Sequence, residues 1–401
     1  MVQVRRVELL APTALAIVLG VLSVYLHFQD NTMLMHSDKM WVDGMAMHRQ
    51  YYPFSVRLFT TSAVQFLNSV FGVSFQVAFG VVQYSLFVAL ALVFYRFLRI
   101  IGFDRLLSNL GVAMLLSAYP ILCAFFEPVY TWDDLWQYVA TVLAFSLIAQ
   151  GKCLWAAVVL SLGALAREAT LILYPVYVYA LLANHPPTKR TLVLSSLIPL
   201  IVYGVFAALT YQTPEPERFH QFRRNFVNAA WAANAAYSLI ISFGYLWVTS
   251  FLSLVRYGTT IFTQRRLSFL VVGASFAVPA TIVLTFLTTF ARETRLFFPP
   301  FVFIIPLSLW MIREKSATLQ WFYRWGRGVP AIIMLALATW FGIWAARILF
   351  PSFDYRSEQH FSQVFLGIQI AIAILIMIPL IVSLTRSMSR VSDDCRQTHA
   401  G

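Results

Sequence analysis

Residues 153–183 read CLWAAVVLSLGALAREATLILYPVYVYALLA, an apolar run whose only charged side chains are the adjacent Arg167 and Glu168. As one α-helix this run would be about 46 Å long at 1.5 Å per residue, although the hydrocarbon core of a bilayer is only about 30 Å thick. The charged pair also lies at its middle. We therefore expect two short helices that form a hairpin, with Arg167 and Glu168 at the apex.

The rest of the chain has the same apolar character. Of its 401 residues, 60% are hydrophobic, 16% are aromatic and only 11% are charged, and the mean hydropathy is +0.73. A soluble protein of this size is far more polar. The composition predicts an all-α, polytopic transmembrane protein with a single integral membrane domain over residues 1–401.

Ten further segments are apolar over most of the length that a crossing needs. The first follows Arg5 and Arg6 and has no small-residue cleavage site, so we interpret it as a retained helix and not as a signal peptide. With the hairpin, the chain makes eleven or twelve crossings. The ten segments are residues 7–28, 76–95, 107–126, 135–150, 191–211, 232–254, 267–290, 296–312, 329–349 and 363–385.

The distribution of charge favours the hairpin over a single crossing, because Lys and Arg accumulate in cytoplasmic loops. With the hairpin, 18 of the 29 basic residues and five of the 17 acids lie on the cytoplasmic side, which gives +13 inside and −1 outside. Both termini, including a short tail over residues 386–401, are then cytoplasmic. The remaining loops then lie on the extracytoplasmic side.

Neither the net charge nor the cysteines point to another class of function. The net charge of +12 is explained by topology and by contact with anionic membrane lipids, and it does not indicate nucleic acid. Cys123, Cys153 and Cys395 are far apart and show no metal-ligand spacing.

The hairpin topology places most of the acidic residues on the outer face. That face receives a long first loop over residues 30–75, which we expect to hold amphipathic helices, and also the Glu127–Asp134 turn, the hairpin apex and the turn Arg292–Arg295. Ionisable groups near membrane depth usually face a cavity and pair with one another. Arg167, Glu168 and Glu293 are therefore expected in an ion-pair network; the alternative is that these loop charges are solvated.

In the first loop, Asp38 and Asp43 are candidates for acid–base or metal chemistry. Residues five apart on a helix point in different directions, so the two acids are expected to take different roles. Asp38 has the alternative role of a helix cap. His36 and His48 have no standard metal-site spacing, and a surface role is favoured for both.

Several arginines are candidates for phosphate binding, because a guanidinium grips phosphate in a planar, bidentate manner. Arg57 follows a Pro-Phe pair, and its alternative role is to reach lipid headgroups. Arg292 and Arg295, in the sequence RETR, could clamp a phosphate while Glu293 fixes their geometry. The alternative is a structural ion-pair network with Glu168.

A further polar cluster precedes the segment 135–150. Glu127, Asp133 and Asp134 could bind the hydroxyl groups of a sugar while Trp132 stacks on its ring. The alternative, which we favour slightly for the tryptophans, is anchoring at the membrane interface.

Four features together resemble polytopic membrane glycosyltransferases of the GT-C type. They are the acidic first loop, the Arg after a Pro-Phe, the LxxLAREATLILYP segment (Leu162–Pro175) and the ETRLFFPP segment (Glu293–Pro300). The resemblance implies a polyprenyl-phosphate-linked sugar as donor and a glycan, lipid or protein as acceptor. It also implies an inner (plasma) membrane protein of a bacterium whose active face is extracytoplasmic. It implies a catalytic carboxylate at Asp38 or Asp43 and a donor-phosphate contact at Arg292 or Arg295.

This chemistry fits the residues on the outer face, since sugar transfer needs a carboxylate to accept a proton and cations to stabilise the departing phosphate. A divalent cation, Mg²⁺ or Mn²⁺, is compatible with carboxylate ligands, but the sequence specifies no ligand set. A secondary transporter or lipid flippase, and a non-catalytic scaffold of the same fold, remain the alternatives.

Overall fold

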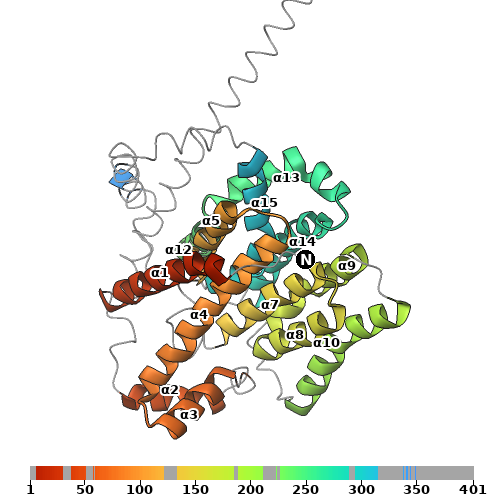
Figure 1. Ribbon diagram of the computed structural model, residues 1–401. Helices are drawn as coiled ribbons and strands as arrows, with labels where there is room; N and C mark the ends of the chain where they lie inside the picture. Colours follow the sequence, from red (N-terminus) through yellow and green to blue (C-terminus); the bar gives the residue numbers. More distant parts are fainter. Residues whose placement is uncertain are drawn as a thin grey trace, which may run out of the picture.

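The computed structural model describes residues 6–29, 38–50, 57, 59–121, 133–184, 188–210, 223, 226–288 and 294–314, together with five single positions between 337 and 348. Helices make up most of these ranges, and no strand occurs in them (Figure 1). The prediction of an all-helical chain is confirmed to that extent.

The helices of the first half begin with the short 3-10 helix η1 (Arg6–Leu9). They continue with α1 (Leu10–Gln29), α2 (Asp38–Gln50), α3 (Phe59–Phe71), α4 (Phe75–Ile100), α5 (Arg105–Leu116), α7 (Asp134–Ala149) and α8 (Cys153–Ala166). The second half comprises the 3-10 helix η4 (Glu168–Leu173), α9 (Tyr174–Asn184), α10 (Lys189–Thr210), α12 (Ala229–Phe243), α13 (Leu246–Thr263), α14 (Ser268–Thr288), the 3-10 helix η6 (Thr294–Phe297) and α15 (Phe301–Glu314).

Three of these helices, α4, α10 and α14, are long and apolar enough to cross a membrane. They coincide with the predicted spans 76–95, 191–211 and 267–290. Much of the surface of α10 is exposed and apolar, with Ile201, Val205 and Leu209 each more than half exposed. Contact with lipid explains such a surface better than contact with water does.

Two predicted spans are interrupted, which corrects the expectation of continuous helices. Helix α5 ends at Leu116 within the span 107–126, four residues before Pro120, which has no N–H to donate to the Leu116 carbonyl and whose ring would clash with it in a continuous helix. The span 232–254 is divided into α12 and α13 at Gly244, whose φ of 48° is in the left-handed region that glycine adopts without steric cost. The spans 329–349 and 363–385 lie outside the described ranges, apart from the five single positions.

The run 153–183 is broken where the sequence predicts a break. Helix α8 ends at Ala166, Arg167 is extended (φ −150°, ψ 129°), and η4 begins at the next residue. The Thr170 hydroxyl donates a 2.8 Å hydrogen bond to the carbonyl of Gly163. In an uninterrupted helix residues seven apart are separated by about 10 Å along the axis, so this bond shows that the chain turns back against the end of α8.

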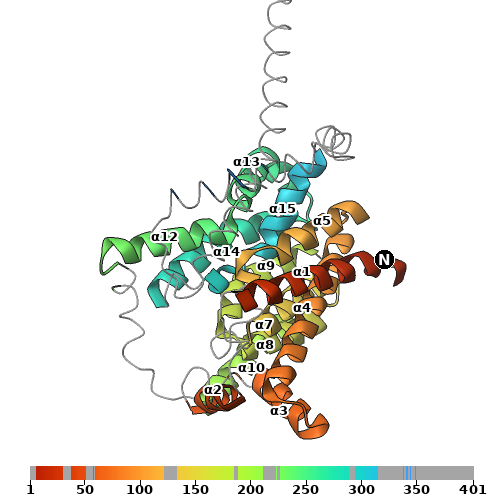
Figure 2. The same ribbon diagram turned by 90° about the vertical axis from the view of Figure 1, so that its left-hand side faces the viewer.

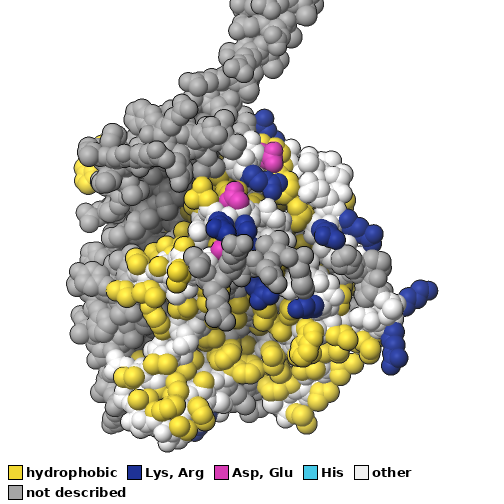
Figure 3. All heavy atoms as spheres, viewed as in Figure 1, with side chains coloured by type: hydrophobic (Ala, Val, Ile, Leu, Met, Phe, Trp, Pro, Cys, Tyr) yellow, Lys and Arg dark blue, Asp and Glu magenta, His cyan; other side chains and the backbone are white. Residues whose placement is uncertain are grey.

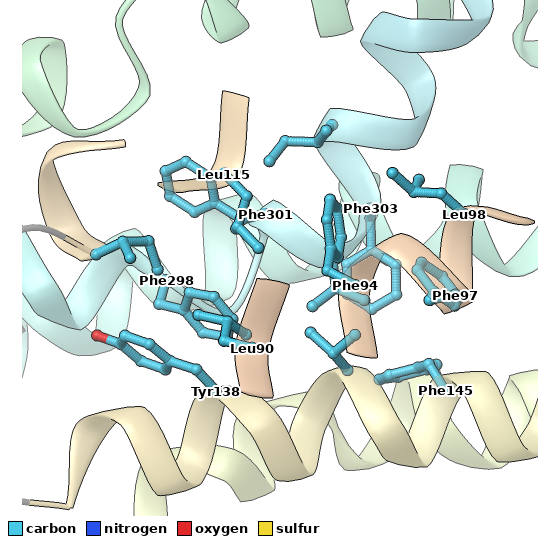
Figure 4. Close-up of a cluster of buried hydrophobic side chains, with 14 of the residues drawn as sticks. Leu90, Phe94, Phe97, Leu98, Leu115, Tyr138, Phe145, Phe298, Phe301 and Phe303 are labelled. Carbon is cyan, nitrogen blue, oxygen red and sulfur yellow. The ribbon is translucent and has the colours of Figure 1, made fainter. Parts of the chain in front are cut away.

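Aromatic side chains from α4, α7 and α15 form the centre of the core (Figure 4). The Phe145 ring of α7 meets the Phe303 ring of α15 edge-on, with centroids 5.0 Å apart. Tyr138 of α7 stacks on Phe298 at 3.7 Å, just before α15. Phe94 and Phe97 of α4 complete this cluster and are fully buried. The core therefore joins the N-terminal helices directly to α15.

Helix α4 has different partners at its two ends (Figures 1 and 2). Helices α2 and α3 pack against its beginning, where the Trp41 ring lies 4.8 Å from that of Phe79. At its other end, Glu8 pairs with Arg105 at 2.6 Å and with Arg99 at 3.7 Å. On the face in Figure 3, basic side chains lie above and to the right of a broad hydrophobic area. The residues predicted to be cytoplasmic thus gather at one end of α4, away from the first-loop helices.

Candidate functional site

A group of charged side chains joins the first loop to the hairpin apex. The guanidinium Nη2 of Arg57 donates a 2.8 Å hydrogen bond to Oε1 of Glu168, across 111 residues of sequence. The Arg57 side chain is 7% exposed and that of Glu168 is 38% exposed. The end of the loop before α3 is thereby tied to the start of η4.

A second ion pair ties the hairpin apex to α7. The guanidinium of Arg167 contacts a carboxylate oxygen of Asp134, the first residue of α7, and both side chains are almost completely buried. Because Arg167 is the extended residue between α8 and η4, the break in the helix directs its side chain toward the neighbouring helix instead of along its own.

The third connection is a hydrogen bond from α3 to Asp133. The backbone N–H of Thr60 donates to Oδ1 of Asp133 at 2.8 Å. Amides in the first turn of a helix have no acceptor within the helix, so Asp133 satisfies one such amide of α3. Asp133 itself precedes α7 in the N-cap position but does not cap that helix. We name Arg57, Asp133, Asp134, Arg167 and Glu168 the charge cluster.

Two carboxyl groups of the charge cluster, both at helix ends outside the three candidate membrane spans, titrate differently. Burial alone would raise the pKa of Glu168, but Arg57 and Arg167 outweigh this effect and lower that pKa to about 2. For Asp133 burial prevails and raises the pKa, despite hydrogen bonds from the Thr60 backbone and hydroxyl and the charges of the two arginines. The cluster therefore combines a strongly acidic carboxyl group with a weakly acidic one.

The ETRLFFPP segment lies close to the charge cluster. Tyr138, on which Phe298 stacks, is one helical turn beyond Asp134 on the same face of α7. Helix η6, which contains the backbone of Arg295, contacts α12 and α14, and α14 in turn contacts η4. Arg292 and Glu293 lie outside the described residues, as does the side chain of Arg295.

The first-loop acids Asp38 and Asp43 are on α2. Asp38 is the first residue of this helix, and its side chain lies outside the described part of the structure. Asp43 is exposed and forms no ion pair or hydrogen bond with the described cluster side chains. Trp41 and Met45, on the same helix, are each only 4% exposed and fix α2 against the bundle.

The structure brings together residues for which the sequence predicts separate roles. Arg57 is expected at phosphate and Asp133 and Asp134 at a sugar, yet all three belong to the charge cluster. Glu168 pairs with Arg57 and Arg167 pairs with Asp134, and the expected partner Glu293 lies outside the described residues, as do Glu127 and Trp132. Thr60 is not foreseen, because nothing in the sequence marks a backbone amide as the partner of a distant carboxylate.

No group of three or more His, Cys, Asp or Glu side chains arranged to hold a metal ion occurs in the described ranges. Cys153 is a buried free thiol. Comparison with protein-family models, with curated proteins and with solved structures finds no match to this chain.

Proposed function

We propose that this protein is a membrane glycosyltransferase of the GT-C type, which moves a sugar from a polyprenyl-phosphate donor to an extracytoplasmic glycan, lipid or protein. The observation that supports the proposal best is the charge cluster. It joins the end of the first loop to the LAREATLILYP break, and the ETRLFFPP segment packs one helical turn away. Three segments that carry the resemblance, far apart in sequence, thus lie at the same end of the bundle.

In the proposed reaction, a hydroxyl oxygen of the acceptor attacks the anomeric carbon of the donor sugar. The bond between that carbon and the phosphate oxygen breaks, and its electron pair leaves with the polyprenyl phosphate. Asp38, or alternatively Asp43, takes the proton of the attacking hydroxyl. Arg292 and Arg295 stabilise the charge on the departing phosphate. Arg57, being paired with Glu168, holds the first loop in place.

The proposal includes a topology of eleven or twelve crossings in the bacterial inner membrane. Both termini are cytoplasmic, and the charge cluster is at the extracytoplasmic end. Two observations support this arrangement: the turn of the chain at Arg167, and the gathering of Glu8, Arg99 and Arg105 at the other end of α4.

The proposal is tested by giving the purified chain a panel of polyprenyl-phosphate-linked sugars with membrane extract as acceptor, and measuring released polyprenyl phosphate. We expect Asp38→Asn to lower turnover by about 10² to 10⁴-fold while donor binding stays unchanged. Normal turnover in Asp38→Asn together with an inactive Asp43→Asn would transfer the role to Asp43. Unaltered turnover in both variants would remove this loop from the mechanism.

A transporter or lipid flippase is the second candidate, and the observation in its favour is the broken helix at Arg167, since discontinuous helices are common at transport sites. The same assay separates the two functions. A flippase moves the donor across the bilayer with the bond between sugar and phosphate intact, and therefore releases no polyprenyl phosphate. A non-catalytic scaffold would also release none and would be indifferent to Asp38→Asn.

A further inference from the structure

Asp133 differs from the other carboxyl groups of the charge cluster in its contacts. Its Oδ1 accepts the hydrogen bond from the Thr60 N–H. Its Oδ2 is buried and has no hydrogen-bond partner among the described residues, and the residue is 2% exposed. Neither oxygen forms a salt bridge within the described ranges, whereas Asp134 and Glu168 each have an arginine partner.

The charges of the cluster balance without Asp133. Arg57 and Glu168 form one ion pair, and Arg167 and Asp134 form the other. An ionised Asp133 would add one negative charge that has no partner of its own. Burying an unpaired charge is much more costly than burying a neutral polar group, and an oxygen without a hydrogen-bond partner is more unfavourable when charged than when neutral.

We propose that Asp133 keeps its proton at neutral pH and, as a neutral carboxyl group, is the positioning residue that fixes the start of α3 against α7. The proton resides on Oδ2, because Oδ1 accepts the Thr60 bond. Since α3 continues the loop that carries Asp38 and Asp43, the inference gives Asp133 a role in placing the proposed catalytic carboxylate. To that extent it rests on the proposed function.

The surroundings of Asp133 support this assignment. The charged groups that act on it are Arg57 before α3 and Arg167 at the hairpin apex, and these arginines are themselves paired with Glu168 and Asp134. Burial raises the pKa of Asp133 more than the hydrogen bonds from the Thr60 backbone and hydroxyl and the charges of the two arginines lower it. Raising the pH through this pKa would place an unpaired negative charge between α3 and α7, and we expect the start of α3 to detach.

The test compares substitutions that separate charge from shape. Asp133→Asn keeps an acceptor oxygen for the Thr60 N–H and is permanently neutral, so it should behave as the protonated wild-type residue does. Asp133→Ala removes the acceptor. Glu314→Gln, at an exposed position of α15, is the matched control for the loss of one carboxyl group. All variants are made in the full chain and purified in detergent.

Two measurements decide between a protonated and an ionised Asp133. The infrared spectrum at neutral pH should contain a protonated-carboxyl carbonyl band that is present in wild type and in Glu314→Gln but absent in Asp133→Asn. Hydrogen exchange, corrected for the intrinsic effect of pH, should show that the first amides of α3 lose protection in wild type as the pH is raised but stay protected in Asp133→Asn. In Asp133→Ala these amides should exchange about tenfold faster at every pH.

Identical infrared spectra for wild type and Asp133→Asn would overturn the inference, because Asp133 would then be ionised. Equal loss of protection in Asp133→Asn and Asp133→Ala would also overturn it. If Asp133→Ala does not fold, the infrared comparison with Asp133→Asn still decides. Neither measurement involves sugar transfer, so failure here is distinct from failure of the proposed function.

Discussion

At the residue scale, the ion pair between Arg57 and Glu168 is the described contact that ties the first loop to the hairpin apex. Its energy depends on exposure, because Arg57 is buried whereas Glu168 is more than a third exposed. Exposed pairs contribute about 0.2 to 1 kcal/mol, and hydrogen bonds to charged groups about 1.5 to 3 kcal/mol. We expect the contribution of the Arg57–Glu168 pair to stability to lie between these two ranges.

A double-mutant cycle with Arg57→Ala and Glu168→Ala should therefore give a coupling energy of about 1 kcal/mol, measured from unfolding of the detergent-purified chain. The same cycle on Glu8 and Arg105 is the control, because Arg105 is 62% exposed and its coupling should be smaller. A coupling energy of zero between Arg57 and Glu168 would show that the contact does not hold the loop.

The acidity of Glu168 predicts a dependence of stability on pH. Its pKa in the folded protein, about 2, lies below its ordinary value of 4.5, so folding is favoured when the group is ionised. This stabilisation is complete above pH 4.5 and is lost as the pH falls from 4.5 toward 2.

The unfolding temperature of wild type should therefore exceed that of Glu168→Gln near neutral pH, and the difference should vanish as the pH approaches 2. Comparing the two proteins at each pH removes the contribution of the other carboxyl groups. A difference that stays constant from neutral pH down to about pH 2 would contradict the assigned pKa.

At the element scale, one close approach between helices depends on a glycine. A Cβ atom on Gly273 of α14 would overlap the ring of Phe303 on α15, and that ring is fully buried between Phe145 and Phe269. Gly273→Ala should destabilise the protein by about 1 to 3 kcal/mol, the usual cost of overpacking.

Gly204 of α10 is the matched control, because a Cβ atom there would meet nothing within 4 Å. Gly204→Ala should be neutral or stabilising by up to about 1 kcal/mol, since alanine favours the helix. Thermal unfolding of both variants in detergent tests the contrast. Equal stability of the two variants would show that α14 and α15 do not pack as described.

The sequence predicted some elements better than others, for physical reasons. The length of run 153–183 and the charges at its centre were sufficient to predict the break at Arg167. The division at Gly244 was not predicted, because an isolated glycine is also tolerated inside a helix. Arg57, Asp134 and Glu168 are charged, so the sequence indicates that each needs a partner if it is buried. Which residues pair depends on which helices pack together, and the local sequence does not specify this.

At the scale of the whole molecule, the described charges collect at two ends of the bundle. The charge cluster lies at one end and the ion pairs of Glu8 lie at the other. We expect the first end to face the outside, because positive charge accumulates on the cytoplasmic side. Single cysteines introduced at positions 43 and 187, with native cysteines replaced, test this orientation by labelling with a membrane-impermeant reagent.

Position 43 should react in intact cells, and position 187 should react only after permeabilisation. Labelling of position 187 in intact cells would reverse the orientation of the hairpin and, with it, the proposed active face. Labelling of position 43 only after permeabilisation would place the first loop on the cytoplasmic side and would likewise contradict the proposed active face.

The most direct test of the central claim is binding of a short-chain polyprenyl phosphate to the purified protein, compared with the matching polyprenol that lacks the phosphate. We expect saturable binding with a clear preference for polyprenyl phosphate. Arg295→Ala should weaken binding of polyprenyl phosphate more than about tenfold, because a hydrogen bond to a charged group contributes about 1.5 to 3 kcal/mol. The contrary result is equal affinity for polyprenyl phosphate and polyprenol in wild type, Arg292→Ala and Arg295→Ala alike. It would contradict the claim that this protein uses a lipid-phosphate donor.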